Sequence, residues 1–203
     1  MTNRAKPELL LASASKTRLA MLSAAGVAVT AVPSALDEET IKLRLRAAGA
    51  EVGSVAQALA QAKASAVGKT RPNALVIGAD QMLVCGENWY DKPGDLGAAR
   101  RQLKSLSGKT HHLLTAVVVV QGDRVLWQYL AQAALTMRSF GPDFLETYLQ
   151  QAGPAILSSV GAYQLEGLGA QLFERIEGDH FTILGLPLLP LLGYLRNAGV
   201  MTS

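Results

Sequence analysis

An aspartate that follows an apolar run is the residue best suited to chemistry in this sequence. Residues 76–79 read Val-Ile-Gly-Ala, which is typical of a buried strand, and Asp80 comes next. The small residues at 78 and 79 leave room for a ligand, and ligands of α/β proteins gather at the carboxyl ends of such strands. Asp80 is therefore a candidate general base or metal ligand. A turn aspartate before a hairpin is the structural alternative.

The segment SASKTR, residues 13–18, indicates an anion site. Ser15 at a helix N-cap would aim its hydroxyl and the free backbone amides at one point, and Arg18, one turn later, could reach the same point. Amides, a positive helix end and a guanidinium make a natural phosphate site, to which Ser13 adds a second hydroxyl. A plain N-cap with an exposed arginine explains this segment equally well. The P-loop and Rossmann glycine patterns are absent.

Further charged residues extend this candidate site. Residues 37–39 read Asp-Glu-Glu, and one of these carboxylates could hold a divalent metal whose other ligands are substrate phosphate oxygens. Lys63 lies in ALAQAKASAV, a helical segment with almost no other charge, and Lys92 projects from an extended backbone before Pro93. Solvated loop acids and helix lysines are the usual alternative for such residues.

The histidines and the cysteine indicate structural roles. His111 and His112 are adjacent on a predicted strand, so they point to opposite faces and cannot bind one metal together there. The single cysteine, Cys85, excludes an internal disulfide and a cluster of thiols, which favours a reducing cytoplasm. No nucleophile–base triad shows a recognisable setting.

Composition places the chain among ordered globular proteins. It has 203 residues, of which 49% are hydrophobic and 17% charged, with a net charge of +3 and no run of like charges. The lack of basic clustering argues against a nucleic-acid-binding module. The most apolar segment, ILGLPLLPLLGYL, is too short to span a bilayer and contains two prolines.

Hydrophobic patterns predict an α/β fold with a mixed sheet and a long antiparallel ribbon, in two lobes around a cleft, within a single domain of residues 1–203. Strands are predicted over 9–11, 27–32, 74–79 and 82–85, and two long strands flank a turn at 121–124. Helices are predicted over 17–25, 54–67, 95–106, 142–151 and 188–197, with Ser54 capping the second and an acidic connection over 34–41.

Taken together, these motifs resemble the Maf family of nucleoside triphosphate pyrophosphatases. SASKTR is similar to the family's SxSPRR opening, LDEE to its acidic loop, AQAKA to its helix-lysine segment and VIGADQ to its strand-end aspartate. DKP, LSGKTH and GAYQLEGLGAQLFERIEGD followed by LGLPL match later family segments. The resemblance runs from Leu9 to Leu195.

This resemblance implies a cytoplasmic homodimer with a fold like that of the inosine triphosphate pyrophosphatases. It implies hydrolysis of a nucleoside triphosphate, ordinary or modified, between its α- and β-phosphates, with Mg²⁺ or Mn²⁺ as cofactor. Asp80 would accept the proton of the attacking water, and Glu38 with Asp80 would bind the metal. The implied substrate-binding residues are Ser13, Ser15, Arg18, Lys63, Lys92 and Glu166.

Departures from the family pattern bear on specificity. Lys16-Thr17 replaces Pro-Arg, while Gln81 and Glu166 stand where many relatives have threonine and glutamine. ADQ and LEG resemble the subgroup that acts on 7-methyl-GTP, and the Glu166 carboxylate could accept hydrogen bonds from guanine N1–H and N2–H₂. The implied role is to keep modified nucleotides out of nucleic acids, with a link to cell-division arrest. A nucleotide-binding regulator of cell division with little turnover is the alternative.

Overall fold

Two compact units make up the computed structural model, which describes residues 7–202. The first contains the residues up to 80, 115–131 and those from 185 onward, and the second contains 81–114 and 132–184. Strands β3 (Leu75–Cys85), β5 (Thr110–Gln121) and β6 (Arg124–Met137) contribute residues to both. The sheet order is β2-β1-β3-β5-β6-β7, with β4 paired to β3, and the pairs are both parallel and antiparallel. The predicted α/β class with a mixed sheet is confirmed.

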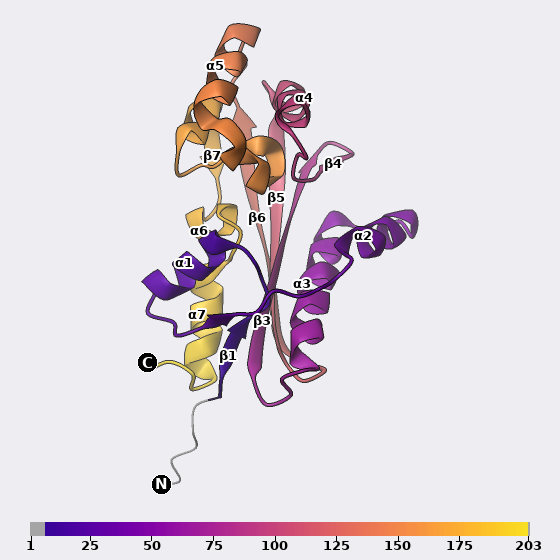
Figure 1. Cartoon of the computed structure of the whole chain (residues 1–203), viewed down its shortest axis with the longest axis vertical. Coiled ribbons are helices and arrows are strands. Elements are labelled where there is room, and N and C mark those ends of the chain that lie inside the picture. The colour runs from indigo at the N-terminus through magenta and orange to yellow at the C-terminus, as the bar shows by residue number, and fades with distance from the viewer. Residues whose placement is uncertain (1–6, 203) are drawn as a thin grey trace. The chain divides into compact units, whose positions relative to one another are not determined.

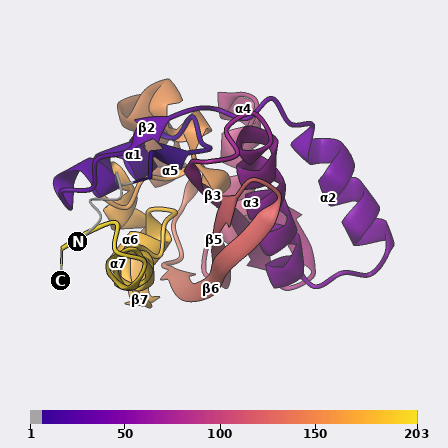
Figure 2. The ribbon, with the colours of Figure 1, turned by 90° about the horizontal axis from the view of Figure 1, so that it is seen from below.

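In the first unit, β1 (Leu9–Leu11) is fully buried between two parallel partners. Leu10 pairs with Thr30 of β2 (Thr30–Ala31) and with Val76 of β3. Figures 1 and 2 show α3 (Val52–Gly68) on one side of these strands and α7 (Leu188–Asn197) on the other. Cover on both faces explains why the strand is an uninterrupted leucine run. The strand predicted over 27–32 is wrong in extent, because only two of its residues pair.

Helix α1 (Lys16–Ala24) ends as the sequence predicts. Gly26 has a φ of +75°, its N–H donates to the Ser23 carbonyl, and the Val27 N–H donates to the Leu22 carbonyl. These two hydrogen bonds form a Schellman motif, which needs the left-handed conformation that glycine adopts easily.

Residues 34–41 were predicted to form an acidic connection, but helix α2 (Glu38–Ala47) begins within this segment. Asp37 is its N-cap and accepts hydrogen bonds from the backbone N–H and the hydroxyl of Thr40. Helix α3 begins two residues earlier than predicted, and its N-cap is Glu51, which makes no side-chain capping bond. The prediction of Ser54 as N-cap is therefore wrong. Helix α7 has the predicted bounds.

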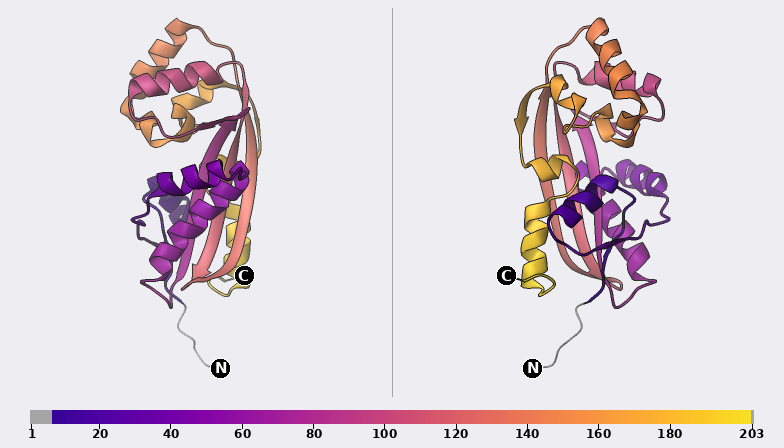
Figure 3. Two further views of the ribbon diagram at one scale, coloured as in Figure 1. Left: turned by 90° about the vertical axis from the view of Figure 1, so that its right-hand side faces the viewer. Right: turned by 60° about the vertical axis from the view of Figure 1, so that its left-hand side comes forward.

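In the second unit, helices α4 (Leu96–Leu106) and α5 (Pro142–Ala152) lie on one face of the strands (Figure 3). Its elements are β4 (Asn88–Tyr90), α4 (Leu96–Leu106), α5 (Pro142–Ala152), the 3₁₀ helices η1 (Gly153–Ser158), η2 (Val160–Ala162) and η3 (Leu168–Leu172), β7 (Phe173–Glu177) and α6 (His180–Ile183), with parts of β3, β5 and β6. Leu103, Leu106, Leu145 and Leu149 bury the inner faces of α4 and α5 in one apolar core. Over residues 7–202, no helix has the length and apolarity needed to cross a membrane.

Candidate active site

A buried lysine and two carboxylates form the centre of the candidate site in the first unit. The Lys63 ammonium lies 2.6 Å from Oδ1 of Asp80 and 2.8 Å from Oε2 of Glu38. Lys63 is 8% exposed and Asp80 is 7% exposed, whereas the Glu38 side chain is 47% exposed. Lys63 thus joins two carboxylates that the sequence singled out separately.

Close packing of α3 on β3 brings Lys63 and Asp80 together. A Cβ on Gly78 would collide with the carbonyl oxygen of Ala60 and would lie 2.8 Å from the Cβ of Ala64. Gly78 therefore makes room for the helix. The sequence interpretation that Gly78 makes room for a ligand is wrong, because α3 fills the space where a side chain of residue 78 would lie. The same packing places Lys63, between these two alanines, above the strand.

Asp80 also differs from the prediction in its position along the strand. Strand β3 continues through Cys85, so Asp80 lies within the strand and not at its carboxyl end. Burial raises the pKa of Asp80, and this rise is opposed first by Lys63 and then by Arg18. Burial likewise lowers the pKa of Arg18, against the attraction of Asp80 and Glu38, although a guanidinium remains protonated in proteins. The four side chains form a balanced set of two positive and two negative charges.

Ser13, Ser15 and Arg18 meet at the start of α1. Ser15 is the N-cap, and its hydroxyl oxygen accepts a hydrogen bond of 3.3 Å from the Arg18 backbone N–H. The Ser13 hydroxyl oxygen accepts from the Ser15 backbone N–H at 3.2 Å and from Nη1 of Arg18 at 3.3 Å. The predicted cap is confirmed. The exposed arginine of the structural alternative is not found, because Arg18 is half-buried and hydrogen-bonded.

Two backbone carbonyls hold the Arg18 guanidinium, and sequence reasoning missed both. Nη1 donates to the Ala79 carbonyl at 2.9 Å, directly before Asp80, and Nε donates to the Gly185 carbonyl at 2.7 Å. Gly185 has a φ of +100°, and a Cβ there would lie 3.5 Å from the guanidinium. Nothing local in the sequence links residue 185 to residue 18. The arginine fastens α1 to β3 and to the segment that precedes α7.

Lys92 and Glu166 belong to the second unit, so their part in the site stays a prediction. Lys92 is exposed after β4, and Glu166 is exposed in the turn between η2 and η3. Gln81, the first residue of this unit, donates from Nε2 to the carbonyls of Thr182 and Ile183 at 3.0 and 3.1 Å. Sequence reasoning did not foresee this link.

His111 and His112 lie on opposite faces of β5, as predicted. His111 is completely buried and His112 is half-buried. Nε2 of His111 shares a 2.8 Å hydrogen bond with the hydroxyl of Tyr163. Cys85 is a buried free thiol. Within residues 7–202, no group of three or more His, Cys, Asp or Glu side chains is arranged to hold a metal ion.

Comparison with known proteins identifies the family of the chain. The family described as Maf-like protein matches residues 8–198 of the chain. The chain belongs to the Maf family. A relative from Hyphomonas neptunium named nucleoside triphosphate pyrophosphatase is 54% identical over 193 residues, which cover 95% of this chain and 97% of the relative. One from Granulibacter bethesdensis with the same name is 49% identical over 195 residues, 96% of this chain and 99% of the relative.

A Maf relative whose name specifies one substrate has a similar sequence identity. The 7-methyl-GTP pyrophosphatase of Rhizobium meliloti is 50% identical over 198 residues, covering 98% of this chain and 100% of the relative. Among solved structures, a HAM1 protein from Coxiella burnetii has a TM-score of 0.39 and 12% identity, with 64% of this chain and 73% of that chain covered.

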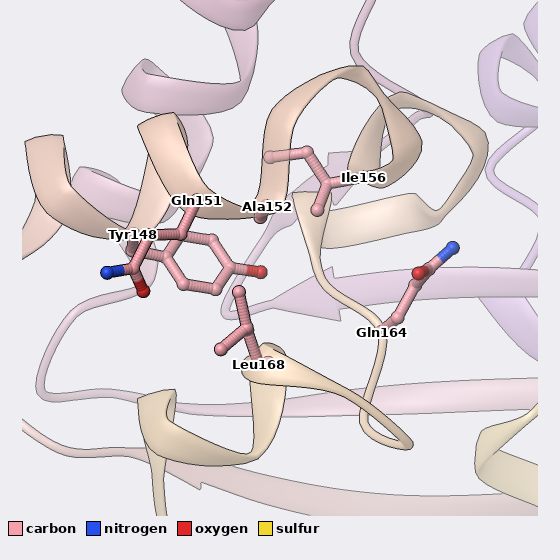
Figure 4. Close-up of a pocket in the computed structure, with 7 residues that line it drawn as sticks. Tyr148, Gln151, Ala152, Ile156, Gln164 and Leu168 are labelled. Atoms are coloured by element: carbon pink, nitrogen blue, oxygen red, sulfur yellow. The ribbon is translucent and has the colours of Figure 1, made fainter.

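A pocket of about 200 Å³ lies in the second unit, next to the turn that carries Glu166. It is lined by Tyr148, Gln151, Ala152, Ile156, Gln164, Leu168 and Gly169. Figure 4 shows the Tyr148 ring close to Leu168, with the Gln164 amide directed away from that ring. None of the lining residues is charged, so they offer no cation to a triphosphate.

Proposed function

We propose that this Maf chain hydrolyses a nucleoside triphosphate between its α- and β-phosphates, giving a monophosphate and pyrophosphate. The observation that carries the proposal is the buried cluster of Asp80, Lys63 and Glu38, next to an arginine fixed at a helix N-terminus. The names of the relatives support the same reaction. The sequence covers nearly their whole length, which supports one Maf-like domain over residues 1–203.

The phosphates would be bound at the start of α1. The hydroxyls of Ser13 and Ser15 donate to phosphate oxygens, and the first amides of the helix attract negative charge. Arg18 adds its positive charge, which is held in place by the two carbonyls. Lys63 and Lys92 neutralise further phosphate charge, including the charge that builds up on the leaving pyrophosphate.

Asp80 would be the proton acceptor. Water attacks the α-phosphorus, the bond from that phosphorus to the α–β bridging oxygen breaks, and its electron pair leaves with pyrophosphate. Oδ1 of Asp80 faces the cation position, which Lys63 holds in this structure, so we assign the water proton to Oδ2. Burial raises the pKa of this carboxyl and so makes it a better base than an exposed aspartate.

Glu38 and Asp80 also fit a divalent metal. Their two carboxylates already hold one cation between them, and Mg²⁺ or Mn²⁺ needs only one or two protein carboxylates when phosphate oxygens complete its shell. The metal would supply Lewis-acid chemistry by drawing electron density from the phosphate oxygens.

We further propose that Glu166 contacts the base of the nucleotide. The substrate is then either 7-methyl-GTP or a nucleoside triphosphate with another base. The name of the Rhizobium meliloti relative favours 7-methyl-GTP, whereas the other two names give no base. A cytoplasmic homodimer that clears modified nucleotides, with a link to division arrest, is part of the same proposal.

The reaction is tested by measuring pyrophosphate release from a panel of triphosphates that includes 7-methyl-GTP, dTTP and UTP. Each triphosphate is assayed with Mg²⁺ and with Mn²⁺. Replacing Asp80 by asparagine should reduce turnover at least about a hundredfold, because the proton acceptor is lost. The control is Asp123→Asn, which changes an exposed aspartate in the β5–β6 turn. Near-normal turnover of Asp80→Asn would refute the assigned base. Triphosphate binding without pyrophosphate release would indicate a regulator instead.

A further inference from the structure

One cation already occupies the pair of carboxylates that would hold the metal. Lys63 Nζ lies 2.6 Å from Asp80 and 2.8 Å from Glu38, with the lysine almost completely buried. Glu38 and Asp80 would hold a divalent ion through these same carboxylates, at the place that the ammonium now takes. The ammonium and the metal ion would therefore compete for the same position.

The charge balance of the cluster indicates when the lysine would leave. The cluster pairs two basic side chains, Lys63 and Arg18, with two acidic ones, Glu38 and Asp80, so a divalent ion added alone disturbs a balanced set. A triphosphate brings several negative charges and many oxygen acceptors. Lysine is a compact charge on a flexible stem and can change partners, whereas the carbonyls fix the Arg18 guanidinium.

We propose that Lys63 is an exchangeable internal cation, which neutralises Asp80 and Glu38 until phosphate oxygens take over its ammonium and leave both carboxylates to the divalent metal. This inference rests on the proposed function. Its consequence is that the nucleotide-free protein binds the metal weakly, and that Lys63 is the reason. Metal affinity is thereby coupled to the presence of the substrate's phosphates.

Direct Mn²⁺ binding without nucleotide tests the proposal, with free Mn²⁺ measured by electron paramagnetic resonance. Lys63→Met should bind Mn²⁺ at least about tenfold more tightly than the wild type, because the competing cation is gone. The matched control is Lys69→Met, which removes an exposed lysine directly after α3 and should bind like the wild type. Adding Asp80→Asn to Lys63→Met should abolish the gain and so locate the ion.

The melting temperature gives a second measurement. Removing Lys63 takes the ammonium away from Asp80 and Glu38 and should lower the melting temperature, because a buried carboxylate then lacks its partner. Mn²⁺ should then raise the melting temperature of Lys63→Met, and of the polar variant Lys63→Gln, more than that of the wild type. Equal or weaker Mn²⁺ binding by the Lys63 variants would overturn the proposal. So would variants that unfold and are not restored by Mn²⁺, since the carboxylates would then need an ammonium specifically.

Pyrophosphate release by the wild type separates this failure from that of the proposed function. If the wild type releases pyrophosphate but Lys63→Met gains no Mn²⁺ affinity, only the cation exchange is refuted. If the wild type releases no pyrophosphate from any triphosphate, the proposed function fails, whatever the Mn²⁺ measurements give.

Discussion

Acid should destabilise the second unit through one buried histidine. His111 is 0% exposed, and its ring lies against the rings of Tyr163 and Phe173 at centroid distances of 5.6 and 5.9 Å. Burial, with a smaller contribution from the charge of His112, lowers the pKa of His111 to about 4. Within the described residues, its Nδ1 atom is buried without a hydrogen-bond partner. The folded protein therefore holds this imidazole in its neutral form.

The direction of the pH effect follows from the two pKa values. The unfolded chain takes up a proton on this histidine near pH 6.5, while the folded chain does so only near pH 4. Stability from this group is therefore complete above about pH 6.5 and is lost as the pH falls toward 4. The loss of unfolding free energy attributable to His111 is about 2 kcal/mol at pH 5 and about 3 kcal/mol at pH 4.

Urea unfolding between pH 7.5 and 4.5 measures this loss by fluorescence. Trp89 belongs to the second unit and Trp127 to the first, so a Trp127→Phe background leaves a reporter for the second unit alone. His111→Gln in that background should lose less unfolding free energy in acid, by about 2 kcal/mol at pH 5, because glutamine does not titrate.

Tyr163→Phe is the matched control for this experiment. It removes the hydrogen bond at 2.8 Å but keeps the histidine buried, so the pH dependence should persist. If His111→Gln lost as much unfolding free energy in acid as the parent, the buried neutral histidine would not be the cause of that loss. If Tyr163→Phe abolished the loss, the hydrogen bond and not burial would be responsible.

Substitutions at three further positions test the scaffold and the site. Gly78→Ala should cost about 1–3 kcal/mol in urea unfolding, because its Cβ collides with Ala60; an unchanged midpoint would contradict this packing. Asp95→Ala should cost about 1 kcal/mol by the same assay, because Asp95 caps α4 through a 2.6 Å bond from the Ala98 N–H, and Asp95→Asn should retain most of the stability. Arg18→Lys should lower kcat/KM for pyrophosphate release at least about tenfold, because an ammonium cannot reproduce the planar guanidinium; equal kcat/KM would remove Arg18 from the site.

Features set by local chemistry were predictable from the sequence. The end of α1 at Gly26 and the bounds of α7 follow from glycine, proline and the apolar pattern, and the structure confirms both. Helix α2 was missed, although a signal was present. Asp37 as a cap, acids in the first turn, and arginines at 44 and 46 in the last turn are the charges that a helix dipole favours.

Features set by contacts between distant segments could not be predicted. The strand expected over 27–32 is short because pairing depends on where β1 lies, which its own β-branched residues do not determine. The bond from Arg18 to the Gly185 carbonyl joins residues 167 positions apart. A backbone carbonyl as partner leaves no trace in residue type, so no sequence pattern could reveal it.

Lys63 shows why residue types alone leave the chemistry of this site open. The sequence correctly marked it as a lysine in a helix with little other charge, and assigned its charge to the substrate phosphates. The structure pairs it with Asp80 and Glu38, which the sequence had treated as the metal ligands. Both interpretations are compatible if the ammonium changes partners when phosphates bind. The two carboxylates are then neutralised at every stage, first by the lysine and then by the metal, and Asp80 is never left as an unpaired buried charge.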